Sequence, residues 1–522
     1  MTTNDESSSV EPATEILSRS VREKIKAIHQ TNYSEDSSSS HPLSFPCIYK
    51  VSKELRRLNK RAYNPWVVSI GPIHNNNDDD KEEQHLKEME HIKVAYTEEL
   101  LCRIAGKSAS PEVKGYWMDK ALMECSAAML HLAASAFNCY ADNLKPIIEN
   151  KIPPHRLAEM LLIDGCFILE LLYRTEDLNT QGDSDQKKKI TQGDPLLGNR
   201  MIMLGIGHDL LLLENQLPFF VLKELFIKTI KTIPDHPWPS CPSLTQFVRS
   251  FFGKVMNINT DDITPNLEED KCFHILHLIH SRFLRISSNH INLEEDKRFH
   301  ILHLINSCFR RIFPNNAPKP SHFSHRATDF HCAGVKFEPD TGVDFKEASG
   351  LQWWCGRAKF KIPPFSIYDS TEPLLRNLIA FEQCCPSIER RRITSYAFLM
   401  DSLIDSAADV ELLEKNHIIN NYLGASEDAS VLFNNICQDA VLEEFDFEKP
   451  RNYAESYCRR LWPRFITSLK HDYFSNPWSV IAVVAAFILF ALGVVQTVYA
   501  LLTYYGVEYE TVRELHDMHS VL

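Results

Sequence analysis

Apolar residues recur at three- and four-residue steps over much of the chain, which is the pattern of helices with one buried face. The first such run covers residues 86–104. Segments with the same spacing follow at residues 119–145, 155–173, 371–384, 393–415 and 426–444. The fold class predicted from this pattern is mainly α, a multi-helix domain.

Four regions depart from the helical spacing. Residues 48–74 and 343–368 mix short apolar runs with proline and glycine, which predicts strands and turns and hence a small β component. Residues 175–200 and 314–342 are polar or rich in Pro and His and are interpreted as loops. Residues 209–226 predict two buried helical pieces that break before Pro218, because proline disfavours a helical conformation in the residue before it.

One helical segment is duplicated. Residues 267–286 and 293–312 agree at 16 of 20 positions, and the copies begin 26 residues apart. Each copy has the apolar stripe of an amphipathic helix. Two copies do not make a solenoid, so the duplication predicts a local extension of a helical layer.

The strongest hydrophobic signal lies near the C-terminus. From Tyr473 to Val507 no residue carries a formal charge. The dense stretch between Val480 and Leu502 is long enough to cross a bilayer core of about 30 Å as a helix. Aromatic residues suit both membrane interfaces, and the predicted anchor is marked by Trp478, Val480, Leu502 and Tyr505. The alternative is a buried core helix of a soluble protein.

Charges beside this stretch predict its orientation. Residues 449–472 hold six Lys or Arg against two acidic residues, whereas residues 508–517 hold one Arg against four acidic residues. The positive-inside rule then places the large N-terminal domain in the cytosol. The acidic N-terminus lacks the basic start and apolar core of a secretory signal. We therefore predict a membrane protein, in the plasma membrane, with its N-terminal domain cytosolic.

These patterns divide the chain into four parts. The first is a Ser-rich, acidic leader whose composition predicts disorder, and the last is an acidic tail. The predicted parts are a leader at 1–40, a helical domain at 41–470 that includes the duplicated helix, a transmembrane anchor at 473–505 and a tail at 506–522.

Charge and cysteine usage narrow the classes of partner. The 522-residue chain has a formal net charge of −13, so it lacks the overall basic footprint of a nucleic-acid-binding protein. Its 14 cysteines include no C-x-x-C pair, which removes support for a zinc ribbon or a thioredoxin-type site. The expected partners are the lipid bilayer and a protein, with no nucleic acid and no cofactor.

Three carboxylates stand in apolar segments and are weak candidates for catalysis. Asp164, Glu214 and Asp401 would each be costly to bury without a hydrogen bond or a charged partner. A general acid/base pair with raised pKa is one interpretation. The more economical interpretation is a helix cap or a buried polar tie, with Arg376 or Arg156 as the expected basic partner.

Histidines of the duplicated helix are weak candidates for metal ligands. His274 and His277, with His300 and His303 in the second copy, have the i, i+3 spacing that brings side chains to one face of a helix. Zinc needs three or four ligands, so the two copies would have to face each other. All four lie off the apolar stripe, and solvated histidines are the preferred interpretation. Gly205 and Gly207 form a lone G-x-G, interpreted as a turn before a cap at Asp209.

Several segments together resemble those of a known family and occur in that family's order. They are IYKVSKELRRLNKRAYNPWVVSIGPIH (48–74), MLLIDGCFILELL (160–172), DLLLLENQLPFFVLKELF (209–226), DSTEPLLRNLIAFEQC (369–384), ITSYAFLMDSLIDSAADVELL (393–413) and DYFSNPWSVIAVVAAF (472–487). The family that these segments resemble is a plant family known as domain of unknown function 247. The resemblance implies a plant protein with a helical domain and one C-terminal membrane helix. It supplies no activity, cofactor or catalytic residues. Some grass members of the family are associated with self-recognition between pollen and stigma, which implies signalling or protein interaction.

The leading hypothesis is a membrane-tethered interaction or signalling module. Tethering would raise its effective concentration at the membrane. A membrane-bound hydrolase or transferase that uses the three carboxylates is the first alternative. An extracellular recognition domain in inverted topology is the second.

Overall fold

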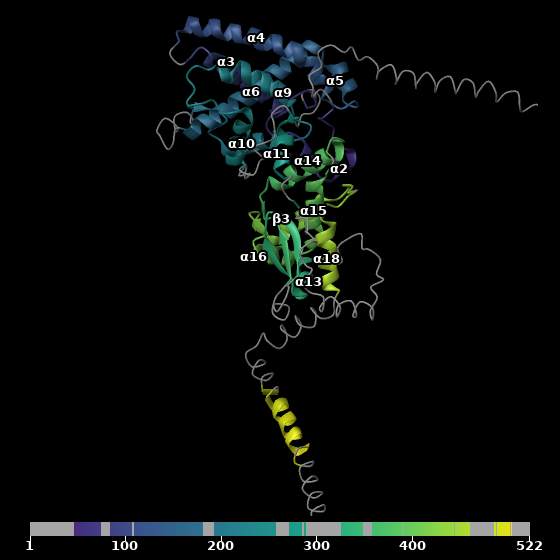
Figure 1. Cartoon of the computed structure of the whole chain (residues 1–522). Helices are drawn as coiled ribbons and strands as arrows, with labels where there is room; N and C mark the ends of the chain where they lie inside the picture. The colour runs from purple at the N-terminus through teal and green to yellow at the C-terminus, as the bar shows by residue number, and fades with distance from the viewer. Residues whose placement is uncertain are drawn as a thin grey trace, which may run out of the picture.

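The computed structural model describes residues 46–74, 84–106, 109–180, 193–256, 271–283, 287–288, 325–347, 358–388, 390–442, 444–459, 485–486, 488–501 and 503. The described chain is mainly helical with two small sheets (Figure 1), as the sequence predicts. The α-helices of the first half are α2 (Lys53–Leu58), α3 (Gln84–Arg103), α4 (Pro111–Asn138), α5 (Lys145–Lys151), α6 (Pro154–Thr180), α8 (Arg200–Asp209), α9 (Phe219–Lys228), α10 (Leu244–Val255) and α11 (Ile275–Phe283). Those of the second half are α13 (Ala327–Cys332), α14 (Thr371–Cys384), α15 (Arg392–Leu403), α16 (Ala407–Lys415), α17 (Ser426–Ile436) and α18 (Glu448–Cys458).

Helix α6 is the centre of the helical half. It contacts α3, α4, α9 and α10. All but one of its residues from Leu161 to Tyr173 are buried, which requires neighbours on every side of the helix. Gly165 allows the close approach of α9, because a Cβ there would lie 2.4 Å from Leu225 Cδ1.

The second half combines helices with the two sheets. In the larger sheet β4 lies between β2, to which it is parallel, and β3, to which it is antiparallel. Helix α18 contacts β3, and α14, α15 and α17 contact one another. The strands are β1 (Ser287–Ser288), β2 (Lys336–Pro339), β3 (Gly342–Lys346), β4 (Lys359–Ile362), β5 (Phe365–Ile367) and β6 (Ile419–Asn421).

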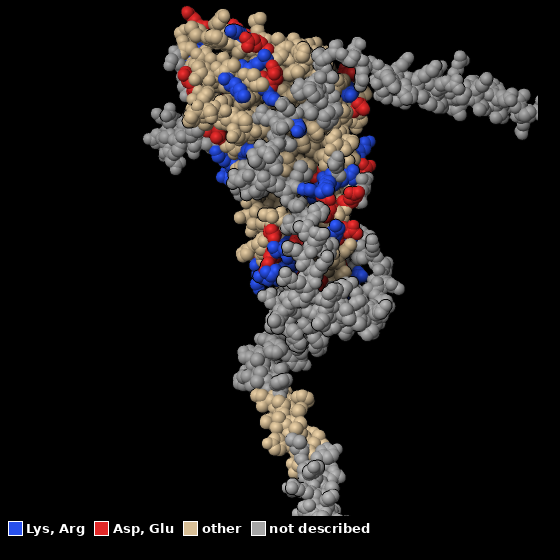
Figure 2. All heavy atoms as spheres, in the orientation of Figure 1, with Lys and Arg blue, Asp and Glu red and all other residues tan. Residues whose placement is uncertain are grey.

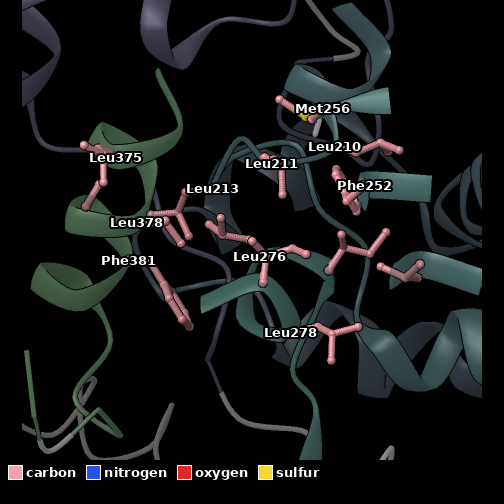
Figure 3. Close-up of a cluster of buried hydrophobic side chains, with 14 of the residues drawn as sticks. Leu210, Leu211, Leu213, Phe252, Met256, Leu276, Leu278, Leu375, Leu378 and Phe381 are labelled. Carbon is pink, nitrogen blue, oxygen red and sulfur yellow. The ribbon is translucent and has the colours of Figure 1, made fainter. Parts of the chain in front are cut away.

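A shared apolar core joins the two halves. Figure 3 shows Leu378 and Phe381 of α14 pointing toward Leu213 and Leu276, which come from the 210–218 segment and α11. All four side chains are buried and belong to one continuous hydrophobic cluster. The helical half and the sheet-containing half therefore pack as one folded body.

Helix positions agree best with prediction where the apolar spacing is unbroken. Residues 86–104 and 371–384 are helical as predicted, in α3 and α14. The predicted helix at 393–415 is two helices, because Ser406 begins α16 with a capping box to Asp409.

Residues 209–226 contain one of the two predicted helical pieces. Only the second piece, α9, is helical, and residues 210–218 lie in turns and irregular backbone. The reason is visible at Gln216, whose Nε2 donates to the carbonyl oxygens of Leu210 at 2.7 Å and Leu212 at 2.8 Å. These side-chain bonds satisfy backbone acceptors that a helix would otherwise engage.

Three further segments differ from the predictions. Residues 48–74 contain α2 and a 3₁₀ helix (Lys60–Tyr63), and their one described bridge joins Ile48 to Tyr140. Helix α6 continues to Thr180, inside the predicted 175–200 loop. The predicted 314–342 loop contains α13 and β2.

Two predictions concern residues that are only partly described. The first copy of the duplicated helix contains α11, whereas the second copy, with His300 and His303, lies outside the described residues. The predicted anchor residues Trp478, Val480, Leu502 and Tyr505 also lie outside them. Within the described residues, every helix is too short or too polar to cross a membrane.

Candidate functional site

Residues 66–74 form an irregular segment of bends and turns, and all of residues 68–72 are buried. A buried backbone outside helices and strands must still find hydrogen-bond partners for its N–H and C=O groups. Here no described strand lies beside the segment, so the partners are side chains from α3, α6, α8 and the 210–218 segment. These side chains include Asp164, one of the three carboxylates that the sequence singles out.

Asp209 binds the start of this segment. Its carboxylate accepts hydrogen bonds from the backbone N–H of Trp66 at 2.8 Å, Val67 at 2.6 Å and Val68 at 2.8 Å. Asp209 is the last residue of α8, and its side chain is fully buried. It therefore caps a segment distant in sequence rather than beginning a helix.

The glycines before Asp209 lie within α8, so the predicted turn is wrong. Gly205 and Gly207 allow the helix to pack closely on its neighbours. A Cβ at Gly205 would lie 2.5 Å from Val67 Cγ2, and one at Gly207 would lie 3.0 Å from Met256 Sδ. The G-x-G spacing thus serves helix packing.

Asn215 takes the place of a neighbouring strand. Its Oδ1 accepts from the N–H of Ile70 at 2.7 Å, and its Nδ2 donates to the carbonyl of Val68 at 3.0 Å. A strand partner would make the same pair of bonds to one edge of the backbone. A single buried amide therefore replaces a strand at this point.

Asp164 and Lys93 hold the next residues of the segment. Asp164 accepts from the N–H of Gly71 at 2.8 Å and from Lys93 Nζ at 2.6 Å. Lys93 Nζ also donates to the carbonyl of Ser69 at 2.7 Å. Burial raises the pKa of Asp164, and Lys93 opposes that shift. Burial also acts to lower the pKa of Lys93, but Asp164 and Glu90 outweigh it and raise the pKa.

Glu214 contacts residues before, within and after α2. Its carboxylate accepts from the N–H of Val51 at 2.7 Å and lies 2.6 Å from Arg56 Nη2 and 3.4 Å from His74 Nε2. Burial acts to raise the pKa of Glu214, but His74 and Arg56 outweigh it and lower the pKa.

The basic partners predicted for these carboxylates are wrong. Arg376 pairs with Glu372 at 2.8 Å and Arg156 with Glu159 at 2.8 Å, each within its own helix. Residues three or four apart on a helix lie close together, which favours such pairs over pairs between residues distant in sequence. The partners that bind Asp164 and Glu214 are Lys93 and Arg56.

Replacing Glu214 by glutamine should lower the free energy of unfolding by about 1–3 kcal/mol at pH 7, because Arg56 loses its buried counter-charge. The lowered pKa means that the carboxylate stabilises the folded state above its ordinary pKa of about 4.3, and that this stabilisation is lost as the pH falls. The difference between Glu214→Gln and the wild type should therefore shrink at pH 4. Urea unfolding at both pH values measures it, and an equal difference at both would contradict the ion pair.

The third carboxylate stands in another part of the fold. Asp401 lies half-buried on α15, where its charge helps burial to raise the pKa of Cys437. Asp164 and Glu214 bind different backbone segments with different basic residues. Two carboxylates converging on one open space would be needed for acid/base chemistry. The geometry instead favours the interpretation of Asp164 and Glu214 as buried ties.

The prediction of solvated histidines is wrong for the first copy of the duplicated helix, because its two candidate histidines are buried or partly buried. His274 is fully buried, and its Nε2 lies 3.1 Å from the carbonyl oxygen of Cys47. Burial lowers the pKa of His274 to about 3. His277 is partly buried, stacks on Phe273 at 4.1 Å and accepts from that residue's N–H through Nδ1. Among the described residues, no group of three His, Cys, Asp or Glu could hold a metal ion.

His280, which the sequence analysis did not single out, is the histidine of this helix that lies beside a buried carboxylate. Its Nε2 lies 2.8 Å from Glu382, which is fully buried near the end of α14. Glu382 also accepts from the N–H groups of Ile393 at 3.0 Å and Thr394 at 2.8 Å, at the start of α15. The sequence offers one indication that His280 differs from the other histidines. The second copy of the duplicated helix has Asn306 at the position that His280 occupies in the first.

The chain is similar to a plant family model and to two proteins of Arabidopsis thaliana. The DUF247 family model, described as plant protein of unknown function, matches residues 48–492. The chain is 26% identical over 472 residues to UPF0481 protein At3g47200 of Arabidopsis thaliana, covering 88% of this chain and 87% of that protein. It is 29% identical over 175 residues to the putative UPF0481 protein At3g02645 of the same plant, covering 32% and 31%. No solved structure matches the chain.

Proposed function

Because the chain belongs to the DUF247 family of plant proteins of unknown function, we propose that it is a membrane-tethered module for protein interaction or signalling. The helical domain is the part that meets other proteins. The stretch around residues 480–502 is the tether. The domain lies on the cytosolic side, and the plasma membrane is the membrane concerned.

The observation that carries the tether is the exposed surface of residues 488–501. These residues are helical, and nearly all of their side chains are exposed. The exposed apolar side chains include Ile488, Leu489, Phe490, Leu492, Val494, Val495, Val498, Tyr499 and Leu501. Apolar surface of this extent all around a helix is stable in hydrocarbon and costly in water. The absence of formal charge from Tyr473 to Val507 supports the same environment.

The interaction role rests on how the buried polar groups are used. Asp164, Asp209, Glu214 and Glu382 each bind backbone N–H groups inside the fold. They are engaged in holding the domain together rather than in presenting reactive groups. An adaptor needs a rigid body with an accessible surface, and this arrangement supplies the rigid body.

Removal of residues 473–522 should move the protein from the carbonate-washed membrane pellet into the soluble fraction. The control is removal of residues 508–522 alone, which leaves the apolar stretch intact and should leave the protein in the pellet. Immunoblots of plant cell fractions measure both. A full-length protein and a 473–522 deletion with the same distribution would contradict the tether.

Orientation is tested separately by protease treatment of intact protoplasts. The cytosolic topology predicts that the helical domain is protected until the membrane is permeabilised. Digestion of the domain in intact protoplasts would favour the extracellular alternative. Proximity labelling with the full chain in plant tissue then identifies the protein partners that the proposal requires.

A further inference from the structure

Helix α4 has a second apolar face that no described element covers. Its buried face, with Ala121, Cys125 and Met129, packs toward α6 and α9. Figure 1 shows α4 along the outer edge of the helical half. The opposite face carries a row of exposed residues, here called the α4 seam, made of Val113, Tyr116, Lys120, Met123, Ala127 and Leu130.

The spacing of the α4 seam is that of a coiled coil. Its members follow one another at steps of three, four, three, four and three residues over nearly three heptads. Tyr116 is 65% exposed, Met123 73% and Leu130 59%. Exposed apolar side chains in this strict alternation are typical of a surface that receives another helix. In the space-filling view, most of this end of the molecule is uncharged surface with Lys, Arg, Asp and Glu scattered across it (Figure 2).

The sequence of the seam is complementary to itself in the antiparallel direction. When two copies of α4 run antiparallel, Val113 meets Leu130 of the other copy, Tyr116 meets Ala127 and Lys120 meets Met123. Each contact is repeated by the two-fold symmetry, as in an isologous dimer. Tyr116, the largest residue of the seam, thereby faces Ala127, the smallest, which is how facing layers fill space.

Charge selects the same direction. In the antiparallel arrangement Lys120 lies beside Glu124 of the second copy, twice over. In a parallel arrangement Lys120 would face Lys120 in the seam, where like charges are destabilising. Lys120 and Glu124 are both exposed, and so are available to a second chain.

In the antiparallel arrangement, Tyr116 of the second copy would lie over a surface groove beside Ala127. The groove has a volume of about 530 Å³ and is lined by residues of α4 and α9, which are Glu124, Ala127, Ala128, His131, Leu132, Glu224 and Lys228. Ala127 is also the residue that Tyr116 of the other copy meets. A phenol ring fits the apolar part of this lining, and its hydroxyl can donate to a carboxylate such as Glu224.

We propose that the protein forms an antiparallel dimer through the α4 seam, with Tyr116 of each copy inserted into the groove of the other. The pairing does not depend on the membrane tether, because its residues all belong to the helical domain. It gives the proposed interaction module a defined partner, which is a second copy of the same chain.

Sedimentation equilibrium of the full chain in density-matched detergent tests the dimer. Met123→Glu should weaken dimerisation by about 100-fold, since it places a charge in the centre of the seam. Met201→Glu is the matched control, because Met201 is an exposed methionine on α8, 76% exposed and outside the seam. It should dimerise like the wild type. A wild type that is monomeric at 50 µM would overturn the proposal, and so would a Met123→Glu variant that dimerises normally. The proposal would also fail if Met123→Glu reduced only the binding of the protein to lipid vesicles.

A charge exchange tests the direction of pairing. Lys120→Glu and Glu124→Lys should each weaken dimerisation by about 10-fold, because each places like charges side by side. The double variant restores opposite charges between the copies and should dimerise within about 3-fold of the wild type. Far-ultraviolet circular dichroism shows whether each variant is folded. Failure of the double variant to recover, with the fold intact, would exclude the antiparallel register.

Discussion

Replacing Asp209 by alanine is expected to lower the free energy of unfolding by about 3–5 kcal/mol, because three backbone N–H groups lose their acceptor and each buried orphan costs about 1–3 kcal/mol. Val68 is completely buried, so its N–H cannot turn to water, whereas Trp66 and Val67 are half-exposed. Losses of this size are a large part of the stability of a typical domain. Urea unfolding followed by circular dichroism measures the change.

Two control variants separate this effect from a general loss of charge. Asp142→Ala removes a side chain that is 86% exposed and pairs with Lys145, and it should change stability by less than about 0.5 kcal/mol. Asp209→Asn keeps the shape but turns an amide donor toward the donors of residues 66–68, so it should remain clearly destabilised. An Asp209→Asn variant as stable as the wild type would show that these N–H groups do not need the carboxylate.

Lys93→Met is expected to destabilise the fold by about 3–5 kcal/mol at pH 7, because it leaves the buried carboxylate of Asp164 without its counter-charge. Lys93 is completely buried and lies 2.6 Å from Asp164. The methionine fills most of the space of the lysine stem, so a packing defect contributes little.

The pH dependence of this variant has a definite sign. Burial already raises the pKa of Asp164, and removal of the opposing Lys93 charge raises it further. An acid whose folded pKa is raised binds more protons in the folded state, so stability falls as the pH rises above its ordinary pKa of about 3.9. Lys93→Met should therefore lie closest to the wild type near pH 4 and furthest from it near pH 7. A pH-independent difference would contradict the buried ion pair.

The apolar spacing of the sequence predicts the helices well, because burial of one face decides both the spacing and the packing. α3 and α14 show this most clearly. Lys93 could also have been found in this way, since it occupies a stripe position between Met89 and Tyr96 of α3. A lysine in such a row signals a buried charge with a partner.

The sequence predicts that the buried carboxylates need partners, but it does not predict which residues these partners are. Their apolar surroundings indicate that Asp164 and Glu214 need partners. Asp164 finds Lys93 across 71 residues of chain, and Glu214 finds the N–H of Val51 across 163, which no local pattern contains. The buried course of residues 66–74 could not be predicted for the same reason, because its hydrogen-bond acceptors come from side chains distant in sequence.

The way in which residues 66–74 are held has a consequence for biosynthesis. Their ties arrive on the growing chain only with Asp164, Asp209 and Asn215, and Asn377 later donates to the carbonyl of Ala62 and accepts from the N–H of Leu213. The ribosome must therefore synthesise Asn215 before residues 66–74 have these partners, and Asn377 before the carbonyl of Ala62 has its donor. Contacts over such separations slow folding. Until then the buried backbone N–H groups of this segment lack their native acceptors, so chaperones that act at the ribosome are expected to bind this stretch of sequence.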